Sequence, residues 1–201
     1  MAPSLSRSGP PHGFRYLPDW LTAEEEQDLL RQVGTLSFSD VRMHGVTARR
    51  KVVHFGWDYG YESWRISRTD LVPAWLRPLQ DRVARLIQTS AAALEEVLVT
   101  RYDPGAGIGW HRDAPMFGPT VVGVSLAGPC RMRFQRKERG TKEQAEILLD
   151  RRSAYILSGA ARWQWQHSIP PTKALRYSIT FRTVIKQQSR SRRDDVIRDG
   201  G

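Results

Sequence analysis

Residues 97–113 read VLVTRYDPGAGIGWHRD, and this stretch decides how the rest of the chain is interpreted. Its first six residues predict a strand, whose side chains would alternate between two faces. The Asp-Pro-Gly that follows favours a turn, because Asp can bond its own backbone, Pro fixes φ and Gly accepts positive φ. We expect His111 and Asp113 at the start of the next strand. Residues two apart there project from one face and could bind one metal ion.

A second histidine strengthens the His-x-Asp pair, which is weak evidence by itself. His167 ends a strand-like segment rich in Trp, and the chain has a single cysteine. Two imidazoles and one carboxylate form the ligand set of non-haem Fe(II) oxygenases, which leaves three metal positions open. The pattern therefore predicts a metal site at His111, Asp113 and His167 that can take a bidentate co-substrate and dioxygen.

The last strand-like segment, ALRYSITFRTVI at residues 174–185, carries two arginines. Arg176 and Arg182 share one face of a strand, because side chains alternate with a period of two. A buried arginine is costly unless it meets an anion, and its planar fork fits a carboxylate. A solvated strand face is the plainer alternative in so basic a chain. The clean alternation and the short distance from His167 favour the anion site.

The composition predicts one packed domain. The chain has 201 residues, 40% of them apolar, with seven Trp. Its one cysteine, Cys130, excludes internal disulfides and Cys-based zinc sites, and we expect it to be a small buried residue. No apolar run approaches a membrane span, and the N-terminus lacks the apolar core of a signal peptide. These features predict a cytoplasmic protein.

The net charge of +10 leaves two interpretations open. An Arg-rich genome would produce a basic protein without functional meaning. A basic domain is also the electrostatic footprint of a nucleic-acid partner.

The chain outside these motifs predicts a mainly β protein with packed helices, a β-sandwich or jelly roll. A capping box at Thr22 and Glu25 predicts a helix that ends before Gly34, and a second helix is expected at residues 78–88. Two strands, 41–46 and 51–57, are expected to flank a hairpin turn at His44-Gly45. Further strands are expected at residues 97–102, 120–126, 131–135, 147–149, 153–157, 163–166 and 174–185.

Both ends of the chain differ in composition from the part between them. Residues 1–13 are rich in Ser, Pro and Gly and are expected to be disordered. Residues 187–201 form a charged tail with little periodicity, expected to be solvated. The remaining residues, 14–186, are expected to form the single domain.

Four of these features together resemble the AlkB family of Fe(II)- and 2-oxoglutarate-dependent dioxygenases: Tyr102, the His111-Arg-Asp113 motif, His167 and the RYSITFR of the last strand. The resemblance covers about residues 14–186. It implies a double-stranded β-helix (jelly-roll) oxygenase with an N-terminal nucleotide-recognition lid. The lid would occupy about residues 38–68 and the catalytic core about residues 95–186.

The resemblance also assigns roles to individual residues. It implies that the catalytic Fe(II) is bound by His111, Asp113 and His167. Its implied contacts to 2-oxoglutarate come from two strands: Thr100 and Tyr102, then Arg176, Ser178 and Arg182. Arg176 would meet the distal carboxylate, and Arg182 would lie near the end that chelates iron. Thr100 and Ser178 stand where the family often has Asn, and both can still hydrogen-bond.

The implied substrate contacts lie in the lid and in one loop. Trp57, Tyr59 and Tyr61 belong to an aromatic cluster from which a ring could stack on a flipped base, although some of these rings must be core. Arg139 matches a family arginine at the mouth of the substrate site. Residues 49–51, Arg-Arg-Lys, flank the lid and suit phosphate contacts.

The sequence thus predicts oxidative dealkylation of alkylated or etheno-adducted bases in DNA or RNA. Fe(II), O2 and 2-oxoglutarate would be used, and succinate, CO2 and an aldehyde released. One alternative is an oxygenase of the same fold that modifies RNA, such as tRNA, or protein. Another is a non-catalytic nucleic-acid-binding module. The expected partner is nucleic acid with damaged or modified bases. No membrane and no obligate protein partner are indicated, and a monomer is expected.

Overall fold

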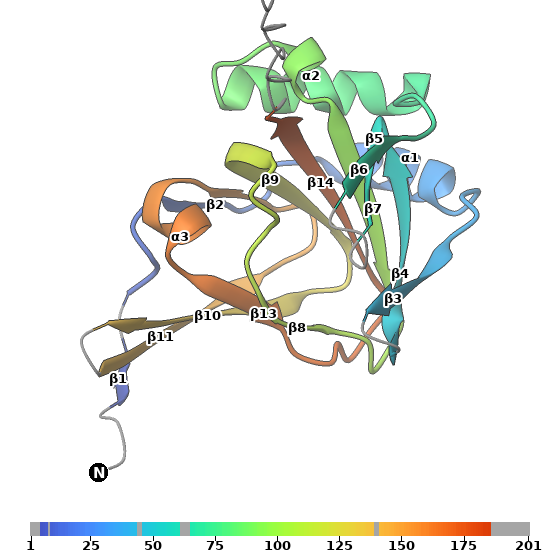
Figure 1. Cartoon of the computed structure of the whole chain (residues 1–201). Coiled ribbons are helices and arrows are strands. Elements are labelled where there is room, and N and C mark those ends of the chain that lie inside the picture. The colour runs from blue at the N-terminus through green and yellow to red at the C-terminus, as the bar shows by residue number, and fades with distance from the viewer. Residues whose placement is uncertain (1–4, 8, 44–45, 61–64, 139–140, 186–201) are drawn as a thin grey trace, which may run out of the picture.

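Two β-sheets face each other in the computed structural model and enclose one of the protein's two main cores (Figure 1). The structure describes residues 5–7, 9–43, 46–60, 65–138 and 141–185. Strands dominate this part of the chain, so the prediction of a mainly β protein with a jelly-roll architecture is confirmed.

The larger sheet has seven strands, in the order β2, β12, β9, β14, β7, β4, β3. Their bounds, in that order, are Phe14–Leu17, Ala154–Leu157, Phe117–Ala127, Arg176–Val184, Glu96–Tyr102, Val46–Phe55 and Ser39–Met43. The last long strand of the chain, β14, lies in the middle of this sheet and pairs antiparallel with both β9 and β7. A central strand has a packed layer on each of its faces, so both of its rows of side chains are buried.

The smaller sheet has five strands, in the order β1, β11, β10, β13, β8. Their bounds are Leu5–Arg7, Thr141–Leu149, Cys130–Glu138, Gln166–Ile169 and Ile108–His111. A separate sheet of two strands, β5 (Trp57–Gly60) and β6 (Arg65–Arg68), lies in the region expected to be the lid, and we call it the lid sheet.

Helices contribute to the layer outside the larger sheet. Helix α1 (Ala23–Val33) begins at the predicted capping box: Thr22 Oγ1 accepts from the backbone of Glu25, and the Glu25 carboxylate accepts from the backbone of Thr22. Helix α2 (Arg77–Leu86) and the 3₁₀ turns η1 (Ala74–Leu76) and η2 (Ala91–Ala93) lie there too, whereas α3 (Gly159–Trp163) contributes Ala161 to the core between the two sheets. In the described residues no helix is long and apolar enough to cross a membrane.

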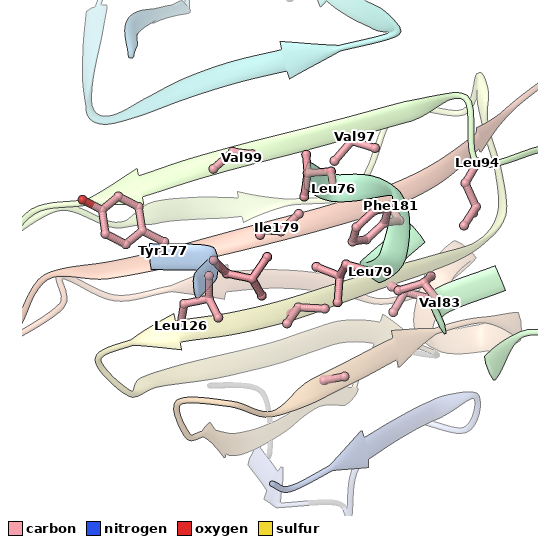
Figure 2. Close-up of a cluster of buried hydrophobic side chains, with 14 of the residues drawn as sticks. Leu76, Leu79, Val83, Leu94, Val97, Val99, Leu126, Tyr177, Ile179 and Phe181 are labelled. Carbon is pink, nitrogen blue, oxygen red and sulfur yellow. The ribbon is translucent and has the colours of Figure 1, made fainter. Parts of the chain in front are cut away.

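Strand β14 buries apolar side chains on one face and polar ones on the other. Figure 2 shows Ile179 and Phe181 gathered with Leu79 and Val83 of α2 in one core cluster, between the sheet and the helices. A second cluster, which includes Phe134, lies between the two sheets. The alternate residues of β14 face this second interior, where the site described below is built.

Several sequence expectations differ from the structure. The residues 163–166 do not form a strand, because α3 runs through Trp163 and β13 begins only at Gln166. His111 ends β8 instead of beginning a strand. Residues Leu5–Arg7, expected to be disordered, pair in parallel with β11 as strand β1. The turn at His44-Gly45 and the tail at 187–201 lie outside the described residues, and the domain limits stay a prediction.

Removal of one buried side chain should show how strongly the helical layer is held. Leu79 of α2 points into the core and is 5% exposed, whereas Leu71, which precedes the helix, is 79% exposed. We expect Leu79→Ala to lower the free energy of unfolding by about 2–5 kcal/mol, because it removes apolar contacts and leaves a cavity. The same change at Leu71 should stay within about 0.5 kcal/mol. Urea denaturation followed by circular dichroism measures both, and equal losses would contradict this packing.

Candidate metal and co-substrate site

Pairing of two short strands brings the predicted histidines together. In the antiparallel pair of β13 and β8, His167 lies directly opposite His111. Opposite residues of an antiparallel pair project from the same face, and the two ring centroids are 4.2 Å apart. The Nδ1 atom of His111 lies 2.9 Å from the backbone oxygen of Gly109, a contact that orients the ring.

Asp113 follows the end of β8 and turns its carboxylate toward the same point. Its Oδ2 lies 3.7 Å from Nε2 of His167, and its Oδ1 lies 2.8 Å from Nη2 of Arg182. The structure thus brings together all three side chains that the sequence predicted as ligands. Across the described ranges no three His, Cys, Asp or Glu side chains already stand at the spacing of a complete metal site.

The protonation states at this point suit a divalent cation. Burial lowers the pKa of His111 and, together with the neighbouring His111 ring, lowers the pKa of His167 to about 3. Burial opposes ionisation of Asp113, but Arg182, His167 and His111 outweigh it and hold the pKa of that carboxyl well below its ordinary value. Neutral imidazoles and an ionised carboxylate at neutral pH are the forms that bind metal ions.

Arg182, near the C-terminal end of β14, is shared between two carboxylates. Its Nη2 contacts Asp113, and its Nη1 lies 3.4 Å from Oε1 of Glu96, which is fully buried. Its guanidinium carbon also lies 4.5 Å from the centroid of the Phe117 ring. Glu96 could not be singled out from the sequence, because two adjacent glutamates before a strand are typical of an exposed segment.

Arg176, at the other end of β14, is completely buried. Its Nη2 donates to Oγ of Ser125 at 3.0 Å, and its guanidinium carbon lies 5.2 Å from the centroid of the Tyr102 ring. Among the described residues its Nε and Nη1 have no hydrogen-bond partner. A buried guanidinium with two open donors fits a carboxylate ligand, since the fork can bind both oxygens of one carboxyl group.

The other residues predicted to contact 2-oxoglutarate lie on the same inner face. Ser178 of β14 stands opposite Thr100 of β7, one alternation from the pair Arg176 and Tyr102, and both hydroxyl residues are buried. Tyr155 of β12 also lies here, and burial raises the pKa of its phenol to about 12. No motif or spacing in the sequence singled out Tyr155.

A family model described as the 2OG-Fe(II) oxygenase superfamily matches residues 13–182. The chain belongs to this superfamily.

Several relatives and one solved structure carry the names of AlkB homologues. An Arabidopsis thaliana protein named "Alkylated DNA repair protein ALKBH8 homolog" is 30% identical, over 80% of this chain and 51% of that protein. The mouse protein named "tRNA (carboxymethyluridine(34)-5-O)-methyltransferase ALKBH8" is 26% identical, over 81% of this chain and 25% of its own. A solved structure described as "The structure of OsALKBH1" superposes with a TM-score of 0.66 at 14% identity, covering 85% of this chain and 96% of that one.

These findings confirm the predicted family, AlkB, and the predicted enzyme class, a dioxygenase that depends on Fe(II) and 2-oxoglutarate. They also confirm the expected requirement for Fe(II), 2-oxoglutarate and O2. The chain spans about half the length of the Arabidopsis relative and a quarter of the mouse relative. The names of those whole proteins therefore do not fix the substrate of this oxygenase.

The residues predicted to bind substrate are only partly described. Trp57 begins β5, where its Nε1 donates to Oε2 of Glu95 at 3.1 Å and the guanidinium of Arg68 lies 4.9 Å from its ring centroid. Tyr59 lies on the same strand, whereas Tyr61 and Arg139 are outside the described residues. The lid aromatics and Arg139 stay predicted substrate contacts.

Arg50, which was expected to contact phosphate, is buried. Arg50 is 5% exposed, and its charge helps to lower the pKa of His111. Its side chain therefore lies in the interior near the candidate metal site. Arg49 and Lys51, its neighbours on β4, are exposed as phosphate contacts require.

A buried arginine of α3 holds the loop after the His-x-Asp motif of the oxygenase. Arg162 donates to four backbone oxygens, those of Asp113, Ala114, Phe117 and Gly118, at 2.9–3.3 Å. The hydrogen bonds of this one side chain therefore hold the loop that carries Asp113. Sequence reasoning missed Arg162 because backbone acceptors leave no residue pattern.

Loss of this arginine should destabilise the protein measurably. We expect Arg162→Met to lower the free energy of unfolding by about 3 kcal/mol, because buried carbonyl groups lose their charged donor. The exposed Arg85 on α2 provides a matched control, and Arg85→Met should cost less than about 0.5 kcal/mol. Urea denaturation of both variants without metal measures the difference; equal stability of the two would contradict the role of Arg162.

Proposed function

We propose that this oxygenase removes alkyl or etheno adducts from bases of DNA or RNA. In this proposal His111, Asp113 and His167 hold Fe(II), and Arg176 binds the distal carboxylate of 2-oxoglutarate. Succinate, CO2 and an aldehyde are the products beside the restored base.

The pair of buried arginines on β14 is the observation that carries the assignment of the site. Arg182 meets the carboxylate of Asp113, beside the two histidines, whereas Arg176 keeps two open donors deeper in the same interior. A dicarboxylic co-substrate needs a cationic partner at the end remote from the metal. Arg176 supplies that partner on the strand that also orders the metal ligands.

The protein residues have binding and orienting roles in the proposed reaction. Bound Fe(II) with O2 supplies the oxidising power that hydroxylates the carbon attached to the base nitrogen. In the overall balance one oxygen atom of O2 would end in succinate, as 2-oxoglutarate loses CO2, and the other would end in the substrate. The hydroxylated carbon would then leave as aldehyde: the C–N bond breaks with its electron pair going to nitrogen, and the hydroxyl proton passes to that nitrogen or to water. Arg176 and Tyr102 fix the co-substrate, and the buried setting limits competing water.

Three observations support nucleic acid as the substrate. The net charge of +10 favours a polyanion. Arg49 and Lys51 expose cations beside the lid. Trp57 offers an indole ring at the start of the lid sheet, and stacking on aromatic rings is the usual way to hold a base outside its helix. The names of the relatives, one of them a DNA repair protein, point in the same direction.

Modification of tRNA is the second candidate, because the mouse relative is named as an enzyme that acts on tRNA. That name describes a methyltransferase, and this chain matches a quarter of its length. An oxygenase acting on protein has less support, since such a substrate would not require the basic charge. A non-catalytic binding module would not require the open donors of Arg176.

Reconstitution decides between these candidates. The full chain would be loaded anaerobically with Fe(II) and 2-oxoglutarate, then given O2 and oligonucleotides carrying 1-methyladenine, 3-methylcytosine or ethenoadenine. We expect mass spectrometry to show loss of the adduct mass, dependent on both additives. Succinate formed with bulk tRNA but without adduct loss would support the second candidate. No succinate with any substrate would overturn the proposal.

Replacement of Arg176 tests its assigned role directly. We expect Arg176→Gln to raise the dissociation constant for 2-oxoglutarate by about 10- to 100-fold, the loss of a charged hydrogen-bonded contact. Isothermal titration with Mn(II) in place of Fe(II) measures it without turnover. The exposed Arg131, which pairs with Glu146 on the smaller sheet, gives the control Arg131→Gln with unchanged affinity. Equal affinity of both variants would remove Arg176 from the site.

A further inference from the structure

A buried carboxylate links the candidate metal site to the lid sheet. Glu96, at the start of β7, is fully buried and lies opposite Arg182 in the pairing of β7 with β14. Its Oε1 is 3.4 Å from Nη1 of Arg182 and 3.7 Å from Nδ1 of His54. Its other oxygen has no hydrogen-bond partner among the described residues. The Glu96 carboxylate thus lies within ion-pair distance of Arg182 and His54, although Nδ1 of His54 makes no hydrogen bond within the described residues.

His54 continues this chain of contacts toward the lid. It lies on β4, with its Nε2 3.4 Å from Oδ1 of Asp58, which belongs to β5 of the lid sheet. Between them Gly56 has a positive φ of 79°, and a Cβ there would approach the backbone oxygen of Glu95 to 1.9 Å. Only glycine permits this bend, which brings β5 back over the start of β7.

The neighbouring Glu95 holds the lid from another side. Its carboxylate accepts from Nε1 of Trp57, the first residue of β5. Adjacent residues in a strand point to opposite faces, so Glu95 and Glu96 serve different surfaces of the same backbone segment. Glu95 contacts the lid through Trp57, whereas Glu96 lies near His54 on one side and near Arg182 of the candidate metal site on the other.

We propose that Glu96 is a positioning residue for Asp113, acting through Arg182, and that His54 and Asp58 carry this coupling to the lid sheet. The inference rests on the proposed metal site. It makes the order of the lid and the geometry of the metal-binding carboxylate depend on one chain of side chains. Four of them, Asp113, Arg182, Glu96 and His54, are largely buried, and the chain ends at the half-exposed Asp58. Substrate contacts in the lid would then be sensed at the metal.

The charges in this network determine the direction of the effect. Arg182 is attracted to both Asp113 and Glu96, so Glu96 reduces the hold of the arginine on Asp113 and leaves that carboxylate freer to bind a cation. The negative charge of Glu96 also favours a dication nearby, because screening is weak in the buried interior. Both effects predict weaker metal binding when Glu96 loses its charge while its shape is kept.

Titration of the full chain with Co(II) under anaerobic conditions tests this role. Cobalt absorbs visible light in a way that reports its ligand geometry. We expect Glu96→Gln to raise the Co(II) dissociation constant by about 10-fold, the usual size for a residue that orients a ligand, and to change the absorption spectrum. Glu96→Asp keeps the charge and should recover part of the affinity. Asp28→Asn removes an exposed carboxylate that pairs with Arg31 on α1 and should leave the metal affinity and spectrum unchanged.

Hydrogen–deuterium exchange tests the coupling between the metal site and the lid sheet. Co(II) binding should slow hydrogen–deuterium exchange of residues 56–60 and 65–68 in the wild-type protein, because coupling between two sites is reciprocal. His54→Phe interrupts the contact between Glu96 and Asp58, and we expect it to abolish this protection while metal still binds. Protection that persists in His54→Phe would overturn the coupling to the lid.

A variant of the ligand itself separates failure of this inference from failure of the proposed function. Asp113→Asn should eliminate saturable Co(II) binding. If Asp113→Asn binds Co(II) as the wild type does, the proposed metal site is wrong and this inference falls with it. If Asp113→Asn loses binding but Glu96→Gln does not weaken it, the metal site stands and the role of Glu96 is refuted. Urea denaturation of each variant confirms that it is folded.

Discussion

The shared attraction of Arg182 for Asp113 and Glu96 is the interaction on which the interior between the two sheets depends. A carboxylate buried without a partner is strongly destabilising, and the interior here contains two carboxylates that are almost completely enclosed. Arg182 compensates both with one guanidinium. The site can therefore keep an ionised ligand in a dry environment, where that ligand attracts a cation most strongly.

Sheet topology explains why one strand can do this. Strand β14 lies at the centre of the larger sheet, so its odd-numbered residues, such as Ile179, pack under the helices and its even-numbered residues face the second sheet. The even row begins at Arg176 and reaches Arg182. Two cations are thereby placed in one interior at the two ends of a rigid element. The apolar row on the opposite face anchors that element, so the helical layer indirectly fixes the distance between co-substrate and metal contacts.

Local patterns in the sequence were sufficient for the parts of the site that a single segment encodes. The His-x-Asp motif and the alternation around Arg176 and Arg182 are such patterns, and the family resemblance placed them on one fold. Residues 163–166, between the end of α3 and the start of β13, were wrongly predicted to be a strand because Trp163 and Trp165 have high strand propensity. Tertiary packing of a short helical turn against β9 overrode that preference.

Residues whose partners lie far away in the chain could not be recognised. Glu96 meets Arg182 only when β7 and β14 pair, and the charged pair Glu95-Glu96 has the composition of a solvated strand entrance. Arg162 contacts backbone oxygens, which every residue possesses, so no side-chain pattern could reveal it. Register and topology had to be known before either contact could be inferred.

The same electrostatics explain how the fold can exist before metal is bound. Without a counter-charge, Asp113 in a buried site would be forced to take up a proton, and it would then be a poor ligand. Arg182 keeps it ionised in the metal-free protein, but an arginine that held Asp113 too firmly would compete with the cation. Glu96 provides a second carboxylate that shares the guanidinium of Arg182 with Asp113. With Arg182 and Asp113 alone, the arginine would either stabilise the buried carboxylate or leave it available to a metal ion. In the proposed site the charge of Glu96 allows both.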